Sequence, residues 1–212
     1  CLVSTMSADQ LVPPAPPPVP GRCAFGHCLK PVGVAGGSRE QSFRVHVHGE
    51  QFKFSCAHFV AYRGFRERLH GHNYTVDVQM TGRHNPDGYV LNFGALKQAL
   101  REACKEINEH FIVPMKSDVL DIRVDDPPGQ LQMICEDGAR FSMPLDDCVL
   151  LPIMHSTVEE LAEYLYERLV AILGRADLSR RGVRWMEVAV SERPIQQASF
   201  QRGLDSALPS HL

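Results

Sequence analysis

Hydrophobic and polar residues alternate along residues 42–58, which predicts β-structure. This run fits either one long strand or two strands joined at Gly49-Glu50. A second alternating run covers residues 74–80. Residues 84–88, His-Asn-Pro-Asp-Gly, form a turn sequence, and we expect a further strand over 89–93. The pattern therefore predicts antiparallel strands linked by short turns.

Two amphipathic helices are predicted by apolar residues that recur at steps of three and four. The first spans about 15 residues, with a stripe from Leu96 to Phe111 and with Asn92 as its N-terminal cap. The second opens with a capping-box sequence, Ser156-Thr-Val-Glu159, and ends at Gly174. Its apolar stripe consists of Leu161, Leu165, Leu169 and Ile172.

A β-hairpin is predicted between the two helices. Residues 131–143 alternate on either side of an Asp137-Gly138 turn. A last strand over 185–192 follows the second helix, and a polar tail follows that strand. The order of strands, helix, hairpin, helix and strand predicts an α+β fold, with an antiparallel sheet covered on one face.

The N-terminal part has a different composition. Residues 12–20 contain six of the 15 prolines, so we expect residues 1–41 to form a disordered, polyproline-like tail and not a domain. The alternative is that this proline-rich segment binds a partner protein that recognises proline motifs. Cys23 and Cys28 flank a histidine, but there is no second pair of ligands, so we assign them to the tail. One domain is predicted over 42–200, with a flexible C-terminal tail over 201–212.

Composition excludes several classes of protein. The chain has 22 Lys+Arg against 25 Asp+Glu, a balance without the basic excess that binding to nucleic acid needs. No apolar run approaches the roughly 18 residues of a membrane span, so we expect a soluble protein without a membrane partner. Seven scattered cysteines argue against a disulfide framework and predict reduced thiols in the cytoplasm. Earlier removal of a targeting segment stays open.

Three histidines provide the clearest candidate chemistry. His70 and His72 point to the same face of a strand, because side chains alternate with a period of two. A neighbouring strand could add His58. Three neutral imidazoles form a zinc site with an open fourth position, which is typical of catalytic zinc. Ordinary core or surface histidines are the alternative, and His46 and His48 form a second His-x-His pair.

Six segments together resemble the 6-pyruvoyl-tetrahydropterin synthase family. In that family's order they are FSCAHF, GFRERLHGHNYTVDV, DGYVLNFGALK, INEH, HSTVEELAEYL and VAVSE. The resemblance implies that His58, His70 and His72 bind a catalytic Zn²⁺ ion. It also implies the tunnelling fold, a four-stranded antiparallel sheet with two helices on one face, here with an inserted hairpin. Such subunits form trimers around a barrel and stack into homohexamers, with active sites at subunit interfaces.

The resemblance also points to a changed catalytic base. The family's base is a cysteine six residues before the first histidine of His-Gly-His, and Gly64 occupies that position here. Glu67, three residues before His70, resembles the apicomplexan-type branch, in which glutamate replaces cysteine; a solvated loop charge beside Arg66 and Arg68 is the alternative. That branch implies cleavage of 7,8-dihydroneopterin triphosphate to 6-hydroxymethyl-7,8-dihydropterin for folate synthesis. The hairpin over 131–143 and the segment FIVPMKSDVL are similar to the same branch.

Five further residues match functional positions of the family. Glu109 and His110 stand where the family has an Asp-His proton relay, although a histidine at a helix end is the alternative. Glu192 matches the glutamate that holds the pterin, since a carboxylate can accept two parallel N–H bonds; a surface charge is the alternative. Thr157 and Glu159 match a Thr-x-Glu pair at this pocket, although capping also explains them.

Three functions stay open. A thiolate, with a pKa of about 8.5, can be a stronger base than a carboxylate, with a pKa of about 4.3, so glutamate suits removal of a hydroxyl proton and carbon–carbon cleavage. The alternatives are 6-pyruvoyl-tetrahydropterin synthesis by triphosphate elimination, in the tetrahydrobiopterin pathway, and an inactive oligomer that binds zinc and pterin. The residues that bind triphosphate stay open among Arg63, Arg66, Arg68 and Lys97.

Overall fold

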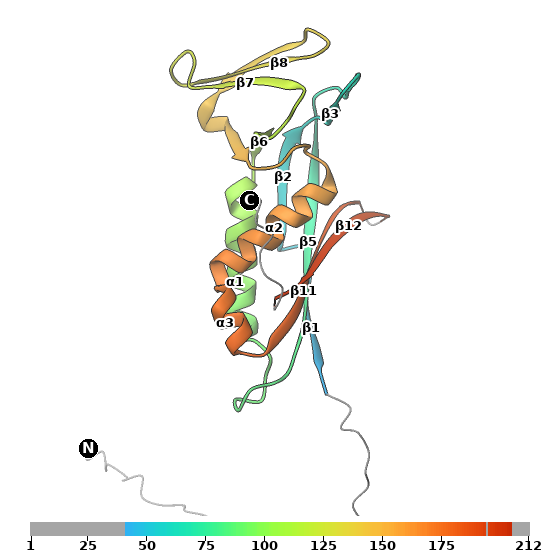
Figure 1. Ribbon diagram of the computed structural model, residues 1–212, viewed down its shortest axis with the longest axis vertical. Coiled ribbons are helices and arrows are strands. Elements are labelled where there is room, and N and C mark those ends of the chain that lie inside the picture. Colours follow the sequence, from blue (N-terminus) through green and yellow to red (C-terminus); the bar gives the residue numbers. More distant parts are fainter. Residues whose placement is uncertain (1–40, 194, 205–212) are drawn as a thin grey trace, which may run out of the picture. The chain divides into compact units, whose positions relative to one another are not determined.

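The structure, a computed structural model, describes residues 41–193 and 195–204 (Figure 1). The predicted tail over 1–41 therefore lies outside the described residues except for its last position. Within them, one large sheet has seven strands: β1 (Phe43–Val47), β2 (Lys53–His58), β5 (His70–Gly82), β6 (His110–Pro114), β10 (Cys148–Leu151), β11 (Val183–Arg193) and β12 (Gln196–Gly203). The break between β1 and β2 confirms the two-strand alternative for the first alternating run.

The sheet is wider than the sequence predicted. Strands β1 and β2 lie one after the other along one edge of β5, while β11 pairs with its other edge and β12 pairs with β11, all antiparallel. Because β1 and β2 share one position in the sheet, these strands occupy the four antiparallel positions that the sequence predicted. Strands β6 and β10 extend the sheet through parallel pairs, β2 with β6 and β6 with β10. The prediction of a purely antiparallel, four-stranded sheet was therefore wrong in strand count and direction.

Helices α1 (Phe93–Ile107), α2 (Val158–Leu173) and α3 (Arg175–Arg180) lie together on one face of the sheet (Figure 1). Helix α1 has the predicted length, and the Asn92 side chain accepts hydrogen bonds from two main-chain N–H groups of its first turn. Helix α2 is capped by Thr157, one residue after the predicted cap. The Ser156 hydroxyl instead donates to the carbonyl oxygen of Phe59. The short helix α3 was not predicted.

The main core lies between the helices and the sheet. Apolar side chains from α1, α2 and the strands pack there, and burial of each large one contributes about 1.5–3 kcal/mol. Polar contacts join elements at the margin of this core. Arg168 of α2 donates two hydrogen bonds to Glu106 of α1, at 2.8 and 2.6 Å. These contacts fix α2, whose N-terminus lies beside the candidate site described below.

A second sheet contains the predicted hairpin. Strands β8 (Gln130–Cys135) and β9 (Arg140–Pro144) form this hairpin, and β7 (Leu120–Val124), which was not predicted, pairs with β8. A short 3-10 helix, η1 (Leu145–Asp147), leads from β9 to β10. The second sheet has its own apolar cluster, which includes Phe59, Phe111, Leu131 and Met133. It therefore packs on residues that flank the ends of β2 and β6.

Two further segments differ from their predictions. Residues 89–93 form no strand, because Val90 and Leu91 are both buried in succession and α1 begins at Phe93. The expected polar tail contains β12, an outer strand whose polar side chains suit a half-exposed edge. This strand extends three residues into the predicted tail over 201–212, of which 205–212 lie outside the described residues. In the described part of the chain, no helix is long and apolar enough to cross a membrane.

Candidate metal centre and active site

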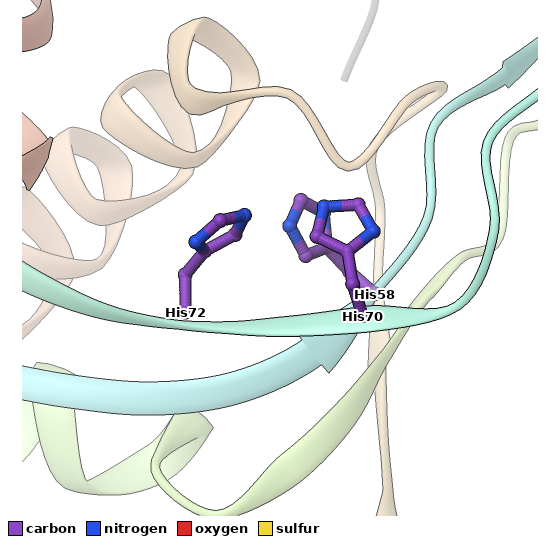
Figure 2. A group of neighbouring side chains, drawn as sticks. All are labelled: His58, His70 and His72. Atoms are coloured by element: carbon purple, nitrogen blue, oxygen red, sulfur yellow. The ribbon is translucent and has the colours of Figure 1, made fainter.

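Three histidine side chains come together at the junction of β2 and β5. His58 is the last residue of β2, and it lies directly across the strand pair from His70, the first residue of β5. His72 follows two residues later on the same face of β5. Figure 2 shows the three rings side by side above the strands, and one possible ligand atom from each lies within 4.8 Å of the others. The sheet register thus assembles the set that the sequence proposed.

The Nδ1 atom of each of the three imidazoles has a hydrogen-bond partner. Each Nδ1 contacts an oxygen acceptor: the carbonyl oxygen of Ser156 for His58 at 2.9 Å, that of Arg68 for His70 at 2.6 Å, and the carboxylate of Glu192 for His72 at 3.1 Å. Because carbonyl and carboxylate oxygens accept hydrogen bonds, each Nδ1 carries the proton. Nε2 is then the possible metal ligand of each ring. Metal-binding histidines typically show this arrangement.

The surroundings keep His58 in the form that binds a metal. His58 is 4% exposed, and burial lowers its pKa, so its imidazole is neutral at pH 7. The hydroxyl of Tyr74, whose pKa is raised by burial, donates to Nε2 of His58 at 3.1 Å, so this hydroxyl must move aside before a metal ion binds the same nitrogen. A set of three imidazoles without a thiolate suits a metal ion such as zinc, with one coordination position left open.

The other His-x-His pair lies elsewhere. His46 and His48 are exposed on and just after β1, with their rings stacked at 4.6 Å. Among the described residues, only the set of His58, His70 and His72 forms a group of three or more possible metal ligands.

Glu67 lies on the connection between two of these histidines. This connection forms a hairpin of β3 (Ala61–Tyr62) and β4 (Phe65–Arg66). Glu67 closes the hairpin, because its N–H donates to the carbonyl oxygen of Val60 at 2.9 Å and its carboxylate accepts from the N–H of Val60 at 3.0 Å. Burial lowers the pKa of His58, and the negative charge of Glu67 partly opposes this effect. The Glu67 side chain thus lies at the base of the hairpin that joins His58 to His70.

Gly64 occupies the exposed tip of the same hairpin. Its φ is 79°, a left-handed conformation that favours glycine. A cysteine here would be strained and would stand at the far end of the hairpin from Glu67. The structure thus gives a backbone reason for glycine at the position where the family resemblance implied a cysteine.

Glu109 and His110 lie beside the cluster and do not join it. His110 begins β6, and its Nδ1 donates to the carbonyl oxygen of Asn108 at 2.7 Å. Glu109 is exposed, with a φ of 61°, and its N–H donates to Ser55. Together with His72, the two residues line an open pocket of about 550 Å³. The predicted relay residues therefore face a surface next to the metal site.

The start of α2 reaches the cluster in a way that the sequence did not indicate. Thr157 caps the helix, and Glu159 is exposed. Ser156, which is fully buried, provides the carbonyl oxygen that orients His58. A main-chain acceptor has no side-chain signature, so no sequence pattern could have found this contact or that of Arg68. Among the triphosphate candidates, Arg66 is engaged in an ion pair with Asp137, while Arg63, Arg68 and Lys97 are exposed.

The fold and the site define a class: an α+β subunit with a three-histidine candidate metal centre at a strand junction. A family model for "6-pyruvoyl tetrahydropterin synthase" matches residues 47–203, and the chain belongs to this family. A Methanocaldococcus jannaschii protein, provisionally named 6-carboxy-5,6,7,8-tetrahydropterin synthase, is 29% identical over 154 residues, which are 72% of this chain and 91% of that protein.

Solved structures place the chain within a branch of the family. The crystal structure of 6-pyruvoyl tetrahydropterin synthase from Plasmodium vivax is 43% identical, covers 77% of this chain and 99% of its own, and gives a TM-score of 0.74. Another structure of that protein is of a variant in which a glutamate, described as a catalytic residue, is replaced by alanine. The chain thus belongs to the apicomplexan-type branch, in which glutamate stands in place of cysteine.

Proposed function

We propose that the protein is a zinc-dependent lyase that cleaves 7,8-dihydroneopterin triphosphate to 6-hydroxymethyl-7,8-dihydropterin, a precursor for folate synthesis. The observation that carries this proposal is the position of Glu67, at the base of the hairpin that joins His58 to His70. The left-handed glycine at position 64 supports it, because the usual cysteine would be strained there. The catalytic glutamate of the Plasmodium vivax relative gives further support.

The residues fit a zinc ion. His58, His70 and His72 would bind it through Nε2, since each Nδ1 is engaged with an acceptor. When bound, zinc lowers the pKa of a hydroxyl group that coordinates it. Glu192 orients His72 and, as a carboxylate, can also accept N–H bonds from a pterin. Thr157 and Glu159 are proposed as weaker substrate contacts at the same pocket.

Glu67 would act as the base. It takes the proton from the hydroxyl group on the second side-chain carbon of the substrate. The electrons of that O–H bond form a carbonyl group, the bond between the first and second carbons breaks, and its electron pair enters the dihydropterin imine. A proton then adds to the first carbon, for which the relay of Glu109 and His110 is the candidate source. The products are 6-hydroxymethyl-7,8-dihydropterin and a two-carbon aldehyde that carries the triphosphate.

A product assay tests this function against its alternatives. The zinc-loaded protein is incubated with 7,8-dihydroneopterin triphosphate, and the pterins are separated by chromatography. We expect 6-hydroxymethyl-7,8-dihydropterin as the main product. Mainly 6-pyruvoyl-tetrahydropterin would instead support triphosphate elimination, the activity for which the family is named. A protein that binds pterin without forming either product would be the inactive oligomer.

We also propose a homohexamer, a dimer of trimers. Strands β10 and β12 end the main sheet on either side, and exposed edges of this kind can pair with a neighbouring subunit. The placement of Glu109 and His110 on the surface pocket also fits a site completed by a second subunit.

A further inference from the structure

The hairpin that ends at Glu67 contacts the second sheet at a defined place. The N–H of Gly64 donates to the carboxylate of Glu136 at 3.1 Å, and Nε of Arg66 donates to the carboxylate of Asp137 at 2.8 Å. Both acidic residues belong to the turn between β8 and β9. The two hairpins also line a shared pocket of about 670 Å³. The turn of the inserted hairpin thus forms two hydrogen bonds with the β3–β4 hairpin.

Arg66 continues this contact to Glu67. Its guanidinium group lies over the rings of Phe59 and Phe141, at 5.8 and 5.6 Å from their centroids, and only 21% of its side chain is exposed. Nη1 of Arg66 donates to the carbonyl oxygen of Glu67 at 2.9 Å. Because guanidinium is planar and rigid, a group fixed by two rings and a carboxylate also fixes that carbonyl oxygen.

We infer that Asp137 is a positioning residue for Glu67, acting through Arg66. This inference rests on the proposed role of Glu67 as the base. A base must lie within hydrogen-bond reach of the proton that it removes, and a displacement of about 1 Å can lower the rate about 10²-fold. The inserted sheet packs on Phe59, next to His58. The same sheet therefore contacts both the hairpin that carries Glu67 and the residue next to His58.

Kinetics of the zinc-loaded enzyme test the inference. Asp137→Ala should lower kcat about tenfold and leave KM within about twofold, because Glu67 removes a proton and does not hold the substrate. Asp137→Glu keeps the carboxylate and should recover most of the rate. Asp121→Ala is a matched control, since it removes an exposed ion pair with Arg123 from the same sheet without touching the hairpin. It should retain the wild-type rate.

A double variant distinguishes an effect of Asp137 on the position of Glu67 from a general loss of enzyme structure. If Asp137 acts through Glu67, adding Asp137→Ala to Glu67→Gln should not lower the residual activity further. The same tenfold loss in both backgrounds, or a loss equal to that of Asp121→Ala, would overturn the inference.

Hydrogen exchange gives a readout that does not need activity. The N–H of Glu67 is bonded to Val60, so Asp137→Ala should speed amide exchange over residues 60–68 about tenfold, and Asp121→Ala should not. Unchanged exchange would show that Asp137 does not hold the hairpin. If the wild-type enzyme forms no 6-hydroxymethyl-7,8-dihydropterin, the proposed function fails, while the exchange result still decides the mechanical coupling.

Discussion

At the residue scale, the site depends on which nitrogen of each histidine is engaged. The sequence identified His58, His70 and His72 because spacing on a strand and the family resemblance agree on them. It did not identify Ser156, which orients His58, or the contact between Glu192 and His72. These contacts join residues that are distant in the chain, and one uses a main-chain oxygen. Sequence patterns therefore predicted the three histidines that the structure brings together, and they missed the groups that hydrogen-bond to these histidines.

Replacement of one ligand should remove the metal. His72→Ala leaves two protein ligands, which make a poor zinc site, so the purified protein should lose most of its zinc by elemental analysis. His48→Ala is the control, since its ring stacks on His46 away from the cluster, and it should keep about one zinc per subunit. Full zinc in His72→Ala would place the metal elsewhere.

Loss of the carboxylate at Glu67 should stop turnover without loss of metal. Glu67→Gln keeps the size of the side chain and removes the proton acceptor, so formation of 6-hydroxymethyl-7,8-dihydropterin should fall about 10²- to 10⁴-fold. Zinc content and pterin binding, measured on the same preparation, should stay at the wild-type level. A near-normal rate would exclude Glu67 as the base and make His110 the next candidate.

At the element scale, regular patterns were predicted well and short ones were not. Helix α1 and strand β5 have long, periodic sequences, and the structure confirms both. Strands β6 and β10 are short apolar runs without alternation, so they carry no strand signal of their own. Strand β12 is mostly polar and was interpreted as a tail. The parallel pairs of β6 and β10 are tertiary features that local patterns cannot show.

The conformation of the β3–β4 hairpin predicts that a cysteine introduced at position 64 will not lead to formation of 6-pyruvoyl-tetrahydropterin. Gly64 has a left-handed φ of 79°, and a side chain there would cost about 1–2 kcal/mol. Gly64→Cys should therefore lower stability in urea denaturation and should not shift the product toward 6-pyruvoyl-tetrahydropterin. Abundant formation of that product by Gly64→Cys would show that the hairpin tip can reach the substrate.

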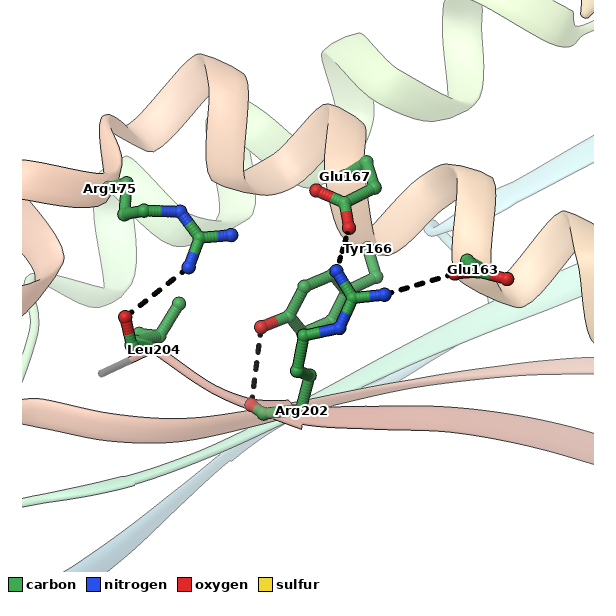
Figure 3. Close-up of polar contacts among 6 residues, drawn as sticks. All are labelled: Glu163, Tyr166, Glu167, Arg175, Arg202 and Leu204. Carbon is green, nitrogen blue, oxygen red and sulfur yellow. Dashed lines mark hydrogen bonds and ion pairs between the residues drawn. The ribbon is translucent and has the colours of Figure 1, made fainter. Parts of the chain in front are cut away.

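One arginine joins the outer strand β12 to helix α2. Arg202 pairs with Glu163 and Glu167 and lies over two aromatic rings, and the Tyr166 hydroxyl donates to its carbonyl oxygen (Figure 3). Its side chain is 18% exposed, so Arg202→Ala should lower the free energy of unfolding by about 1–2 kcal/mol. The control Arg180→Ala removes an exposed pair and should cost less than about 0.5 kcal/mol in the same urea titration.

At the scale of the whole molecule, the separation of His110 from the histidine cluster has a direct consequence. Within one subunit, His110 lines an open pocket beside His72 and does not enter the group of three ligands. An oligomer could bring the His110 of one subunit to the metal site of another. Resemblance to the family predicted such an assembly.

Oligomers that mix two inactive variants test whether each active site combines residues from two subunits. His72→Ala removes a metal ligand and His110→Ala removes the proposed relay, so each variant alone should be inactive. If each site combines zinc from one subunit with His110 from another, random co-assembly of equal amounts should leave about one quarter of the sites intact. Co-expression of the two variants with different tags, followed by tandem purification, isolates the mixed species. Sedimentation should show a mass near six times 23.7 kDa. Mixed hexamers without activity would mean that His110 serves its own subunit, and a monomer would remove the interface altogether.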